Sequence, residues 1–380
     1  MNKQTFLRLL LITMVPLSLN GLIACGESSI EMRDNDAAPQ GLDSCPDPII
    51  IQTDWFPEAE YGATYELFGD GTYLIDNENR SVSGTLHDGE ADTGIGLEVR
   101  TGGPAIGWTP VASHMYTDTS ITLGYANTEG QITRFDSAPL LSVVAPLEKN
   151  PQMIMWDPKT YPDIQSLEDL GEKNVTISVF GPEVFSEVFI AQGIWASSQI
   201  DPSYDGSPAN FIANEGSIAQ QGFASAEPYN YKNTYEEWGK DVKYQLLHDA
   251  GFPVYSQTLA IRPDDKASLD SCLKSLIPII QRSVVSYSTN PESTNALIVD
   301  VVGSFNSFWV YDKGIADYSV QTQWDLGLVG NGENQIVGDM DQNRVQEVID
   351  LMAAAGIDTD GIRPSDIFTN EYIDETIGFK

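Results

Sequence analysis

The sequence predicts an α/β fold arranged as two lobes. Strand-like and helix-like segments alternate along the first half of the chain, which is typical of this fold class. The chain has 380 residues, 41% of them hydrophobic, which is enough to bury more than one core. Two strand-like runs, residues 140–146 and 254–263, flank a self-contained block and could cross between lobes. We therefore expect residues 49–145 and 258–380 to form lobe 1 and residues 146–257 to form lobe 2, with a hinge of two crossing strands.

The early elements follow the order strand, loop, helix. Residues 49–51 are isoleucines, an apolar run typical of a buried strand, and residues 58–68 after Pro57 have apolar positions at helical spacing. The order recurs where Ser166 begins a capping box and residues 174–180 alternate as a strand. Because strands joined through helices run in one direction, we expect a largely parallel sheet.

The last third of the chain is predicted to be mainly helical. Residues 266–287, 290–313 and 344–355 all carry apolar side chains at helical spacing. We expect these helices to wrap back onto lobe 1.

The N-terminal segment has the three parts of an export signal. Lys3 and Arg8 supply the positive start, residues 6–19 the apolar stretch, and small residues precede Cys25. A transmembrane helix is the alternative, but the apolar stretch is shorter than the roughly 20 residues that a span needs. The pattern resembles the signal of bacterial lipoproteins. This resemblance implies that residues 1–24 are removed and that Cys25 carries lipid, so that only the lipid anchor would tie the protein to the outside of the cytoplasmic membrane.

The segment after the signal and the overall charge further limit the function. Residues 25–48 are mostly polar, acidic or turn-forming, which predicts a flexible tether. The chain has 20 Lys and Arg against 55 Asp and Glu, a formal net charge of -35. Such a charge repels nucleic acid and anionic lipid surfaces, so we expect no nucleic-acid partner. The acidity by itself identifies no ligand.

The sequence contains three cysteines, and the lipoprotein pattern assigns Cys25 to the lipid. Cys45 and Cys272 then remain, and in an oxidising compartment such a pair usually forms a disulfide. Two buried free thiols are the alternative. We expect no metal site, because there is no Cys-x-x-Cys motif and the three histidines lie far apart in the sequence.

Four segments, in order, resemble one family of transport proteins. Residues 54–62, with the sequence DWFPEAEYG, resemble the opening signature of solute-binding proteins in the nitrate/sulfonate/thiamine-pyrimidine-precursor group of ABC importers. Residues 103–108, 166–180 and 222–229 resemble the family's ligand-facing loop, a helix-strand unit and its Gly-x-x-x-x-x-Glu-Pro element. The resemblance implies a periplasmic-binding-protein-like fold of type II. It extends over residues 49–264, and the last third of the chain matches none of the family's motifs.

The matched segments contain candidate polar ligand-binding residues. Asp54 follows the first predicted strand, where α/β folds bind ligands, and could accept hydrogen bonds from ring N–H or amino groups. Glu227 would be a second acceptor from the other lobe. Gly181 lies at the start of another predicted helix, whose free amides could bind a carbonyl oxygen. Tyr61 stands where the thiamine-precursor branch often has histidine. The alternative is that Asp54 and Glu227 only cap turns or helices.

Three aromatic residues are candidates for stacking on a flat ligand. Trp55, Trp108 and Tyr229 all lie in the matched segments, and offset stacking contributes about 0.5–1.5 kcal/mol beyond burial. The alternative for each residue is an ordinary position in the hydrophobic core.

These residues and the resemblance together predict an extracytoplasmic solute-binding protein. It would close two lobes over a small heteroaromatic nitrogenous solute, such as a thiamine-pyrimidine precursor or riboflavin, and deliver it to an ABC permease. We expect a monomer that carries out no chemistry and needs no cofactor. One alternative is a binder of another nitrogenous solute, such as an amine or a nucleobase. The other is an extracytoplasmic hydrolase, although the sequence has no Gly-x-Ser-x-Gly, Gly-x-x-x-x-Gly-Lys or His-Glu-x-x-His motif.

Overall fold

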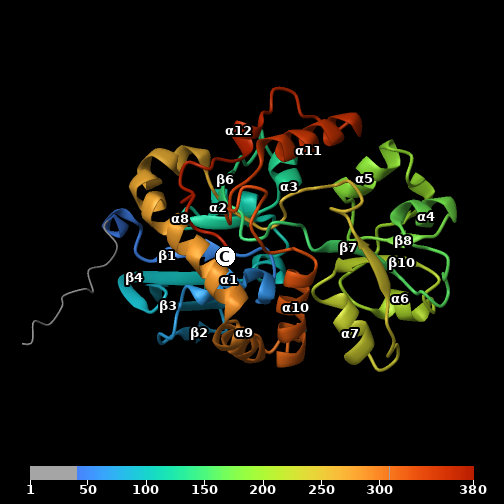
Figure 1. Cartoon of the computed structure of the whole chain (residues 1–380), viewed down its shortest axis with the longest axis horizontal. Coiled ribbons are helices and arrows are strands. Elements are labelled where there is room, and N and C mark those ends of the chain that lie inside the picture. The colour runs from blue at the N-terminus through green and yellow to red at the C-terminus, as the bar shows by residue number, and fades with distance from the viewer. Residues whose placement is uncertain (1–40, 308) are drawn as a thin grey trace, which may run out of the picture. The chain divides into compact units, whose positions relative to one another are not determined.

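The computed structural model describes residues 41–307 and 309–380. The expected signal segment 1–24, the expected lipidation site Cys25 and most of the expected tether lie outside the described residues. The described chain forms two β-sheets with helices packed around them (Figure 1). We call the seven-stranded sheet with its helices lobe 1 and the five-stranded sheet with its helices lobe 2.

The sheet of lobe 1 has the strand order β2-β3-β4-β1-β5-β12-β6. Its strands are β1 (Ile49–Gln52), β2 (Leu74–Asp76), β3 (Ser81–Asp88), β4 (Ala91–Arg100), β5 (Leu123–Ala126), β6 (Leu141–Val144) and β12 (Thr258–Ile261). β1 is parallel to β4 and β5, whereas the other neighbouring pairs are antiparallel. The expectation of a largely parallel sheet is therefore wrong. One reason is the short turn at Gly89, which has a φ of 61° and joins β3 to β4 as a hairpin.

The sheet of lobe 2 has the strand order β11-β7-β10-β8-β9. Its strands are β7 (Gln152–Trp156), β8 (Ile177–Ser178), β9 (Ile200–Asp201), β10 (Ala219–Phe223) and β11 (Lys243–Leu246). β8 is parallel to β9 and β10, and β7 is antiparallel to β10 and β11. All five strands fall between the two segments that connect the sheets.

The two connecting segments differ from the predicted crossings. Residues 141–144 and 258–261, which the sequence placed within the crossings, belong to the sheet of lobe 1 as β6 and β12. The chain instead passes between the sheets at residues 145–151 and 247–257, neither of which contains a strand. The predicted hinge strands are therefore part of lobe 1, and the crossings follow β6 and precede β12.

The helices of lobe 1 cover its sheet, and α8 runs across it in Figure 1. They are α1 (Gly62–Glu66), α2 (Val111–Thr117), α3 (Thr128–Thr133), α8 (Lys266–Thr289), α9 (Glu292–Phe305) and α10 (Lys313–Asp325), with 3-10 helices η2 (Ala59–Tyr61), η3 (Gly103–Ile106) and η5 (Pro263–Asp265). The single helix expected over residues 290–313 does not form. α9 ends at Asn306, whose φ of 46° is left-handed, a conformation that asparagine tolerates and that stops a helix.

The helices of lobe 2 include the predicted capping box. They are α4 (Leu167–Glu172), α5 (Val184–Ala191), α6 (Ala209–Ala213) and α7 (Glu227–Asn233), with the 3-10 helix η4 (Ser197–Gln199). The Ser166 hydroxyl accepts a hydrogen bond from the Asp169 N–H, and the Asp169 carboxylate accepts one from the Ser166 N–H. This arrangement satisfies the free amides at the start of α4, as the sequence predicted.

The C-terminal helix α11 (Gln342–Ala354) connects the two lobes and does not simply cover lobe 1. Its Val345, Val348 and Met352 are buried in one cluster with Phe185 and Phe189 of α5, and it also packs on α3 and on α12 (Pro364–Ile367). In Figure 1, α11 lies between α3 and α5. The sequence predicted packing of this helix on lobe 1, where it contacts α3, but not its packing on α5 of lobe 2.

Arg344 of α11 binds both crossing segments. Its guanidinium donates hydrogen bonds to the backbone carbonyls of Glu148, Pro253 and Val254 at 2.6–3.0 Å. It also lies 3.6 Å from the ring centroid of Tyr255. One buried side chain thus fixes the positions of the two segments that join the lobes.

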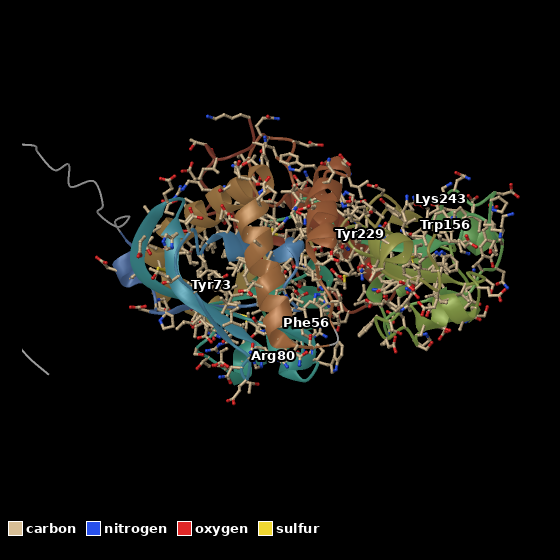
Figure 2. All side chains as sticks on the ribbon, turned by 90° about the horizontal axis from the view of Figure 1, so that it is seen from below. Phe56, Tyr73, Arg80, Trp156, Tyr229 and Lys243 are labelled. Atoms are coloured by element: carbon tan, nitrogen blue, oxygen red, sulfur yellow. A yellow bond between two sulfur atoms is a disulfide. The ribbon has the colours of Figure 1, made fainter. Side chains whose placement is uncertain are left out.

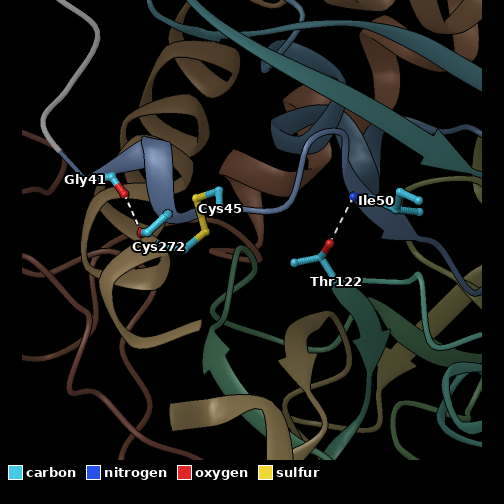
Figure 3. Close-up of a disulfide and its surroundings, with 6 residues drawn as sticks. Gly41, Cys45, Ile50, Thr122 and Cys272 are labelled. Atoms are coloured by element: carbon cyan, nitrogen blue, oxygen red, sulfur yellow. Dashed lines mark hydrogen bonds between the residues drawn. A yellow bond between two sulfur atoms is a disulfide. The ribbon is translucent and has the colours of Figure 1, made fainter. Parts of the chain in front are cut away.

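The folded part begins earlier than the expected tether allows. The 3-10 helix η1 (Leu42–Ser44) packs on α8, and Leu42 is buried. Cys45 is joined to Cys272 of α8 by a disulfide, with 4.7 Å between the two Cα atoms (Figure 3). The predicted tether boundary at residue 48 is therefore wrong, because the residues before β1 are held against α8. No helix within the described ranges combines the length and apolarity needed to cross a membrane.

Candidate functional site

A cavity of about 320 Å³ lies between the two lobes. Lobe 1 contributes residues that follow β1, the loop around Trp108 and Trp309. Lobe 2 contributes residues from the loop after β8, from β10 and from the start of α7. The lining combines four carboxyl groups with aromatic rings, and the predicted residues among them are Asp54, Trp55, Tyr61, Trp108 and Glu227. The structure therefore brings five of the seven predicted binding residues together.

The turn after β1 positions Asp54 and Trp55. The Thr53 hydroxyl donates a hydrogen bond to the Trp55 carbonyl at 2.7 Å, which fixes the backbone around Asp54. The Trp55 ring packs closely on Gly103, where an added Cβ atom would lie 2.9 Å from the ring. Only glycine leaves room for this contact.

Tyr61 acts on the ligand site through Asp54. Its hydroxyl donates a 2.6 Å hydrogen bond to Asp54 Oδ1, and its ring is buried against Tyr125. Burial raises the pKa of the Asp54 carboxyl, while the hydrogen bond from Tyr61 lowers it. Tyr61 thus favours the ionised form of Asp54.

An aromatic chain runs across the cleft from lobe 1 to lobe 2. The ring centroids are 5.6 Å apart for Trp55 and Trp108, 5.7 Å for Trp108 and Phe180, and 6.3 Å for Phe180 and Tyr204. Trp309 packs edge-on against Trp55 at 5.8 Å. These contacts place flat apolar surfaces on both sides of the cavity.

Trp108 is held in an unusual backbone conformation. Its φ is 62°, which is rare for a bulky residue and costs roughly 1–3 kcal/mol. Its N–H donates to the Gly103 carbonyl at 3.0 Å, and 52% of its surface is exposed. A strained and exposed tryptophan at the edge of a cavity is typical of a residue kept for binding.

Glu227 is the first residue of α7. Its Oε2 accepts a 2.6 Å hydrogen bond from the Phe223 N–H, and the missing side chain of Gly222 leaves space for it. Burial raises the pKa of Glu227 to about 7, against the lowering effect of the Phe223 N–H. Near neutral pH, Glu227 can therefore both accept hydrogen bonds and change its charge when a ligand binds.

Sequence reasoning missed two further carboxyl groups in the cavity. Glu58 is only 7% exposed, and burial, then the nearby Glu60, Asp54 and Glu227 carboxyls, raise its pKa well above the ordinary value. Glu183 accepts a 3.3 Å hydrogen bond from the Gln221 side chain; burial raises its pKa to about 7. Glu58 lies inside the matched segment 54–62, so the motif held a signal for it.

Sequence reasoning also missed some of the rings. Phe180, Tyr204 and Trp309 line the cavity but lie outside the residues singled out from the matched segments. Phe180 ends the predicted strand 174–180, and no local pattern marks Tyr204 or Trp309. These residues reach the site only through the arrangement of the two lobes.

Two predicted residues do not line the cavity. Gly181 lies between Phe180 and Glu183, which do line it, and has a φ of 74° with open space around it. Tyr229 packs on Tyr318 of α10 with ring centroids 5.5 Å apart, at the junction of α10 and lobe 2 (Figure 2). Its observed ring contact is therefore with α10 and not with the cavity.

The charge of the lining is one-sided. Among the described residues, the cavity is lined by four carboxyl-bearing side chains and by no Lys, Arg or His. The described part of the chain also contains no cluster of three or more His, Cys, Asp or Glu placed to hold a metal ion. The lining therefore suits a ligand that donates hydrogen bonds or carries positive charge, and it disfavours an anion.

The chain is similar in structure to periplasmic binding proteins. The match to the alkanesulfonate-binding protein SsuA from Xanthomonas axonopodis pv. citri covers 82% of this chain and 94% of that chain, with a TM-score of 0.51 and 13% sequence identity. The match to the periplasmic nitrate-binding protein NrtA from Synechocystis PCC 6803 covers 86% of this chain and 88% of that chain, with a TM-score of 0.52 and 10% sequence identity. The match to a sulfonate-binding protein SsuA from Methylobacillus flagellatus KT covers 86% of this chain and 93% of that chain, with a TM-score of 0.51 and 12% sequence identity.

No protein-family model and no curated protein matches the chain. The structural likeness shows the fold, which is that of the periplasmic binding proteins, with two α/β lobes joined by two crossings. This confirms the fold class that the sequence motifs predicted.

Proposed function

We propose that this protein is the extracytoplasmic solute-binding component of an ABC importer and that it captures a small heteroaromatic nitrogenous solute. The observation that carries the proposal is the cavity between the lobes, whose described lining combines four carboxyl groups with aromatic rings and includes no cationic side chain. A ring nitrogen or amino group supplies the donors that such a lining lacks, and the ring itself matches the aromatic surfaces.

The residues divide the recognition between the two lobes. Trp55 and Trp108 offer ring faces from lobe 1, and Phe180 offers one from lobe 2. Asp54 of lobe 1 and Glu227 of lobe 2 would each accept hydrogen bonds from the solute. Because one ligand would contact both lobes, its binding would stabilise the closed arrangement.

The proposed solute differs from those named for the structural neighbours. SsuA and NrtA are named for sulfonate and nitrate, which are anions. An anion in the cavity of this chain would lie next to the carboxyl groups of Asp54, Glu58 and Glu227 with no cationic partner from the lining. The Coulomb energy would oppose its binding.

The remaining parts of the proposal concern the protein's location and partners. A lipid on Cys25 would hold the protein at the outer surface of the cytoplasmic membrane. Opening at the crossings 145–151 and 247–257 would release the solute to a membrane permease, with the protein acting as a monomer.

Calorimetry with thiamine, aminopyrimidines, riboflavin and nucleobases tests the proposal. We expect one of these solutes to bind the wild type, and Trp55→Ala, Asp54→Asn and Glu227→Gln each to weaken it by about ten- to hundredfold. Matched controls are Trp324→Ala and Glu168→Gln, which lie outside the cavity and should leave affinity unchanged.

Three outcomes would contradict this proposal. Binding of a simple amine in place of any heteroaromatic solute would favour the amine alternative. Turnover of a tested compound, followed by mass spectrometry, would favour an extracytoplasmic hydrolase. Unchanged affinity of the bound solute for all three cavity variants would show that the binding site lies elsewhere.

A further inference from the structure

Glu58 is a largely buried carboxyl group that receives no hydrogen bond from the residues that the structure describes. Its side chain lines the cavity and is only 7% exposed. It is the N-cap residue of η2, but its side chain makes no capping hydrogen bond, and no donor in residues 41–307 or 309–380 hydrogen-bonds to its carboxyl group. A carboxyl group removed from water is stable only when a donor or a positive charge compensates it. Because Glu58 lines the cavity, an occupant of the cavity is placed to supply this donor.

The neighbouring carboxyl groups have donors of their own. Asp54 accepts from the Tyr61 hydroxyl at 2.6 Å, and Glu227 accepts from the Phe223 N–H at 2.6 Å. Glu60 accepts from a serine hydroxyl of lobe 2. These acids are therefore held in place by the protein, whereas Glu58 is not.

The surroundings of Glu58 favour a positive charge. The groups that face it electrostatically are Glu60, Asp54 and Glu227, all acidic. Trp309 is fixed beside the same segment by a 3.3 Å hydrogen bond from its Nε1 to the Pro57 carbonyl, and it lines the cavity together with Trp55. Aromatic faces near carboxylates stabilise a cation through the ring quadrupole.

We infer that the solute is an organic cation whose protonated nitrogen donates hydrogen bonds to Glu58, and that Glu58 selects this charge over a neutral analogue of the same shape. The inference rests on the proposed function, because it narrows the class of solute for the same cavity. It assigns Glu58 a role that differs from ring stacking at Trp55 and from the acceptors Asp54 and Glu227.

The pKa of Glu58 agrees with this assignment. Burial and the neighbouring acids raise the pKa of Glu58 well above its ordinary value, which favours the protonated form relative to an exposed glutamate. A bound cation stabilises the carboxylate and lowers that pKa. Cation binding would therefore shift Glu58 toward its carboxylate form, and a proton that Glu58 gives up would pass to the buffer, so that the charges balance.

The experiment compares two probes that differ in one group. An aminomethyl-substituted aminopyrimidine carries an ammonium where its hydroxymethyl analogue carries a neutral hydroxyl. Calorimetry at neutral pH measures the affinity of both probes for the wild type, Glu58→Gln, Glu58→Asp and the control Glu168→Gln. Repeating the titrations in two buffers of different ionisation enthalpy measures proton release.

We expect the wild type to prefer the aminomethyl probe by at least about tenfold, the value for one hydrogen bond to a charged group. Glu58→Gln should lose this preference and release fewer protons, Glu58→Asp should keep part of it, and Glu168→Gln should match the wild type. Circular dichroism checks that each variant folds.

Three results would overturn the inference. They are equal affinity of the wild type for both probes, a preference that persists in Glu58→Gln, and failure of the aminomethyl probe to bind. The proposed function would survive each of them if riboflavin, a nucleobase or the hydroxymethyl probe binds with dependence on Trp55. Failure of every heteroaromatic solute would instead reject the proposed function.

Discussion

Replacing Glu227 by glutamine should make the ligand-free protein more stable at neutral and alkaline pH. In the folded protein, burial raises the pKa of Glu227 to about 7, against an ordinary value of 4.5. The folded state therefore holds a proton that the unfolded chain has lost between these two values. Glutamine keeps an oxygen that accepts from the Phe223 N–H but cannot ionise.

The magnitude follows from the difference between the two pKa values. Each pKa unit corresponds to about 1.4 kcal/mol. If the whole difference between the two pKa values appeared in the free energy of unfolding, it would contribute about 3 kcal/mol. Glu227 keeps part of its surface exposed, so we expect about 1–3 kcal/mol. The carboxyl stabilises the fold fully below its ordinary pKa, and this contribution is lost as the pH rises through about 7.

Urea denaturation of wild type and Glu227→Gln, followed by tryptophan fluorescence, measures the effect. The two proteins should have nearly equal unfolding free energies at about pH 4.5, and the variant should be more stable at about pH 8. Glu168→Gln is the control, because its carboxyl is exposed. The reasoning is refuted if the stability difference between Glu227→Gln and wild type is the same at both pH values.

Three other substitutions test separate features. Cys272→Ala removes the disulfide with Cys45, which closes a sequence separation of 227 residues. It should lower the unfolding free energy by about 5.4 kcal/mol on the loop-entropy model; equal stability of wild type with and without reductant would contradict this. Arg344→Ala leaves three backbone carbonyls of the crossings without their donor. It should lower the free energy of unfolding, measured by urea denaturation, by about 2–5 kcal/mol. A decrease below about 1 kcal/mol would show that Arg344 does not hold the crossings. Tyr61→Phe removes the hydroxyl that favours ionised Asp54 and should weaken solute binding by about tenfold in calorimetry, whereas unchanged affinity would exclude a positioning role.

Local patterns in the sequence predicted elements whose cause is local. The isoleucines at residues 49–51 became β1, and the Ser166 capping box formed because its donors and acceptors lie within one turn. Strand direction was predicted wrongly because it depends on connections, such as the tight turn at Gly89. The end of α9 at Asn306 depends on a single residue in a left-handed conformation, which helical spacing does not reveal.

The site was predictable where a motif carried it. Asp54, Trp55 and Glu227 lie in matched segments, and the structure places all three on the cavity. Glu58 was missed although it lies four residues after Asp54, because a motif does not show which side chain turns inward. Trp309 comes from the last third of the chain, where no motif matched. Its place beside Trp55 depends on packing between distant segments.

The position of β12 has a consequence for how the protein is made. β12 lies between β5 and β6, and β6 is the edge strand of the described sheet, with only a single bridge from Ser142 to Phe368 on its other side. A ribosome that has synthesised only the first two thirds of the chain has therefore produced β6 without any partner, and β5 with one edge open. Unpaired edges invite association with other chains. The growing polypeptide needs protection from association with other chains until residues 258–261 emerge and form β12. We therefore expect its dependence on chaperones to end at that length and not at the completion of either lobe's sequence.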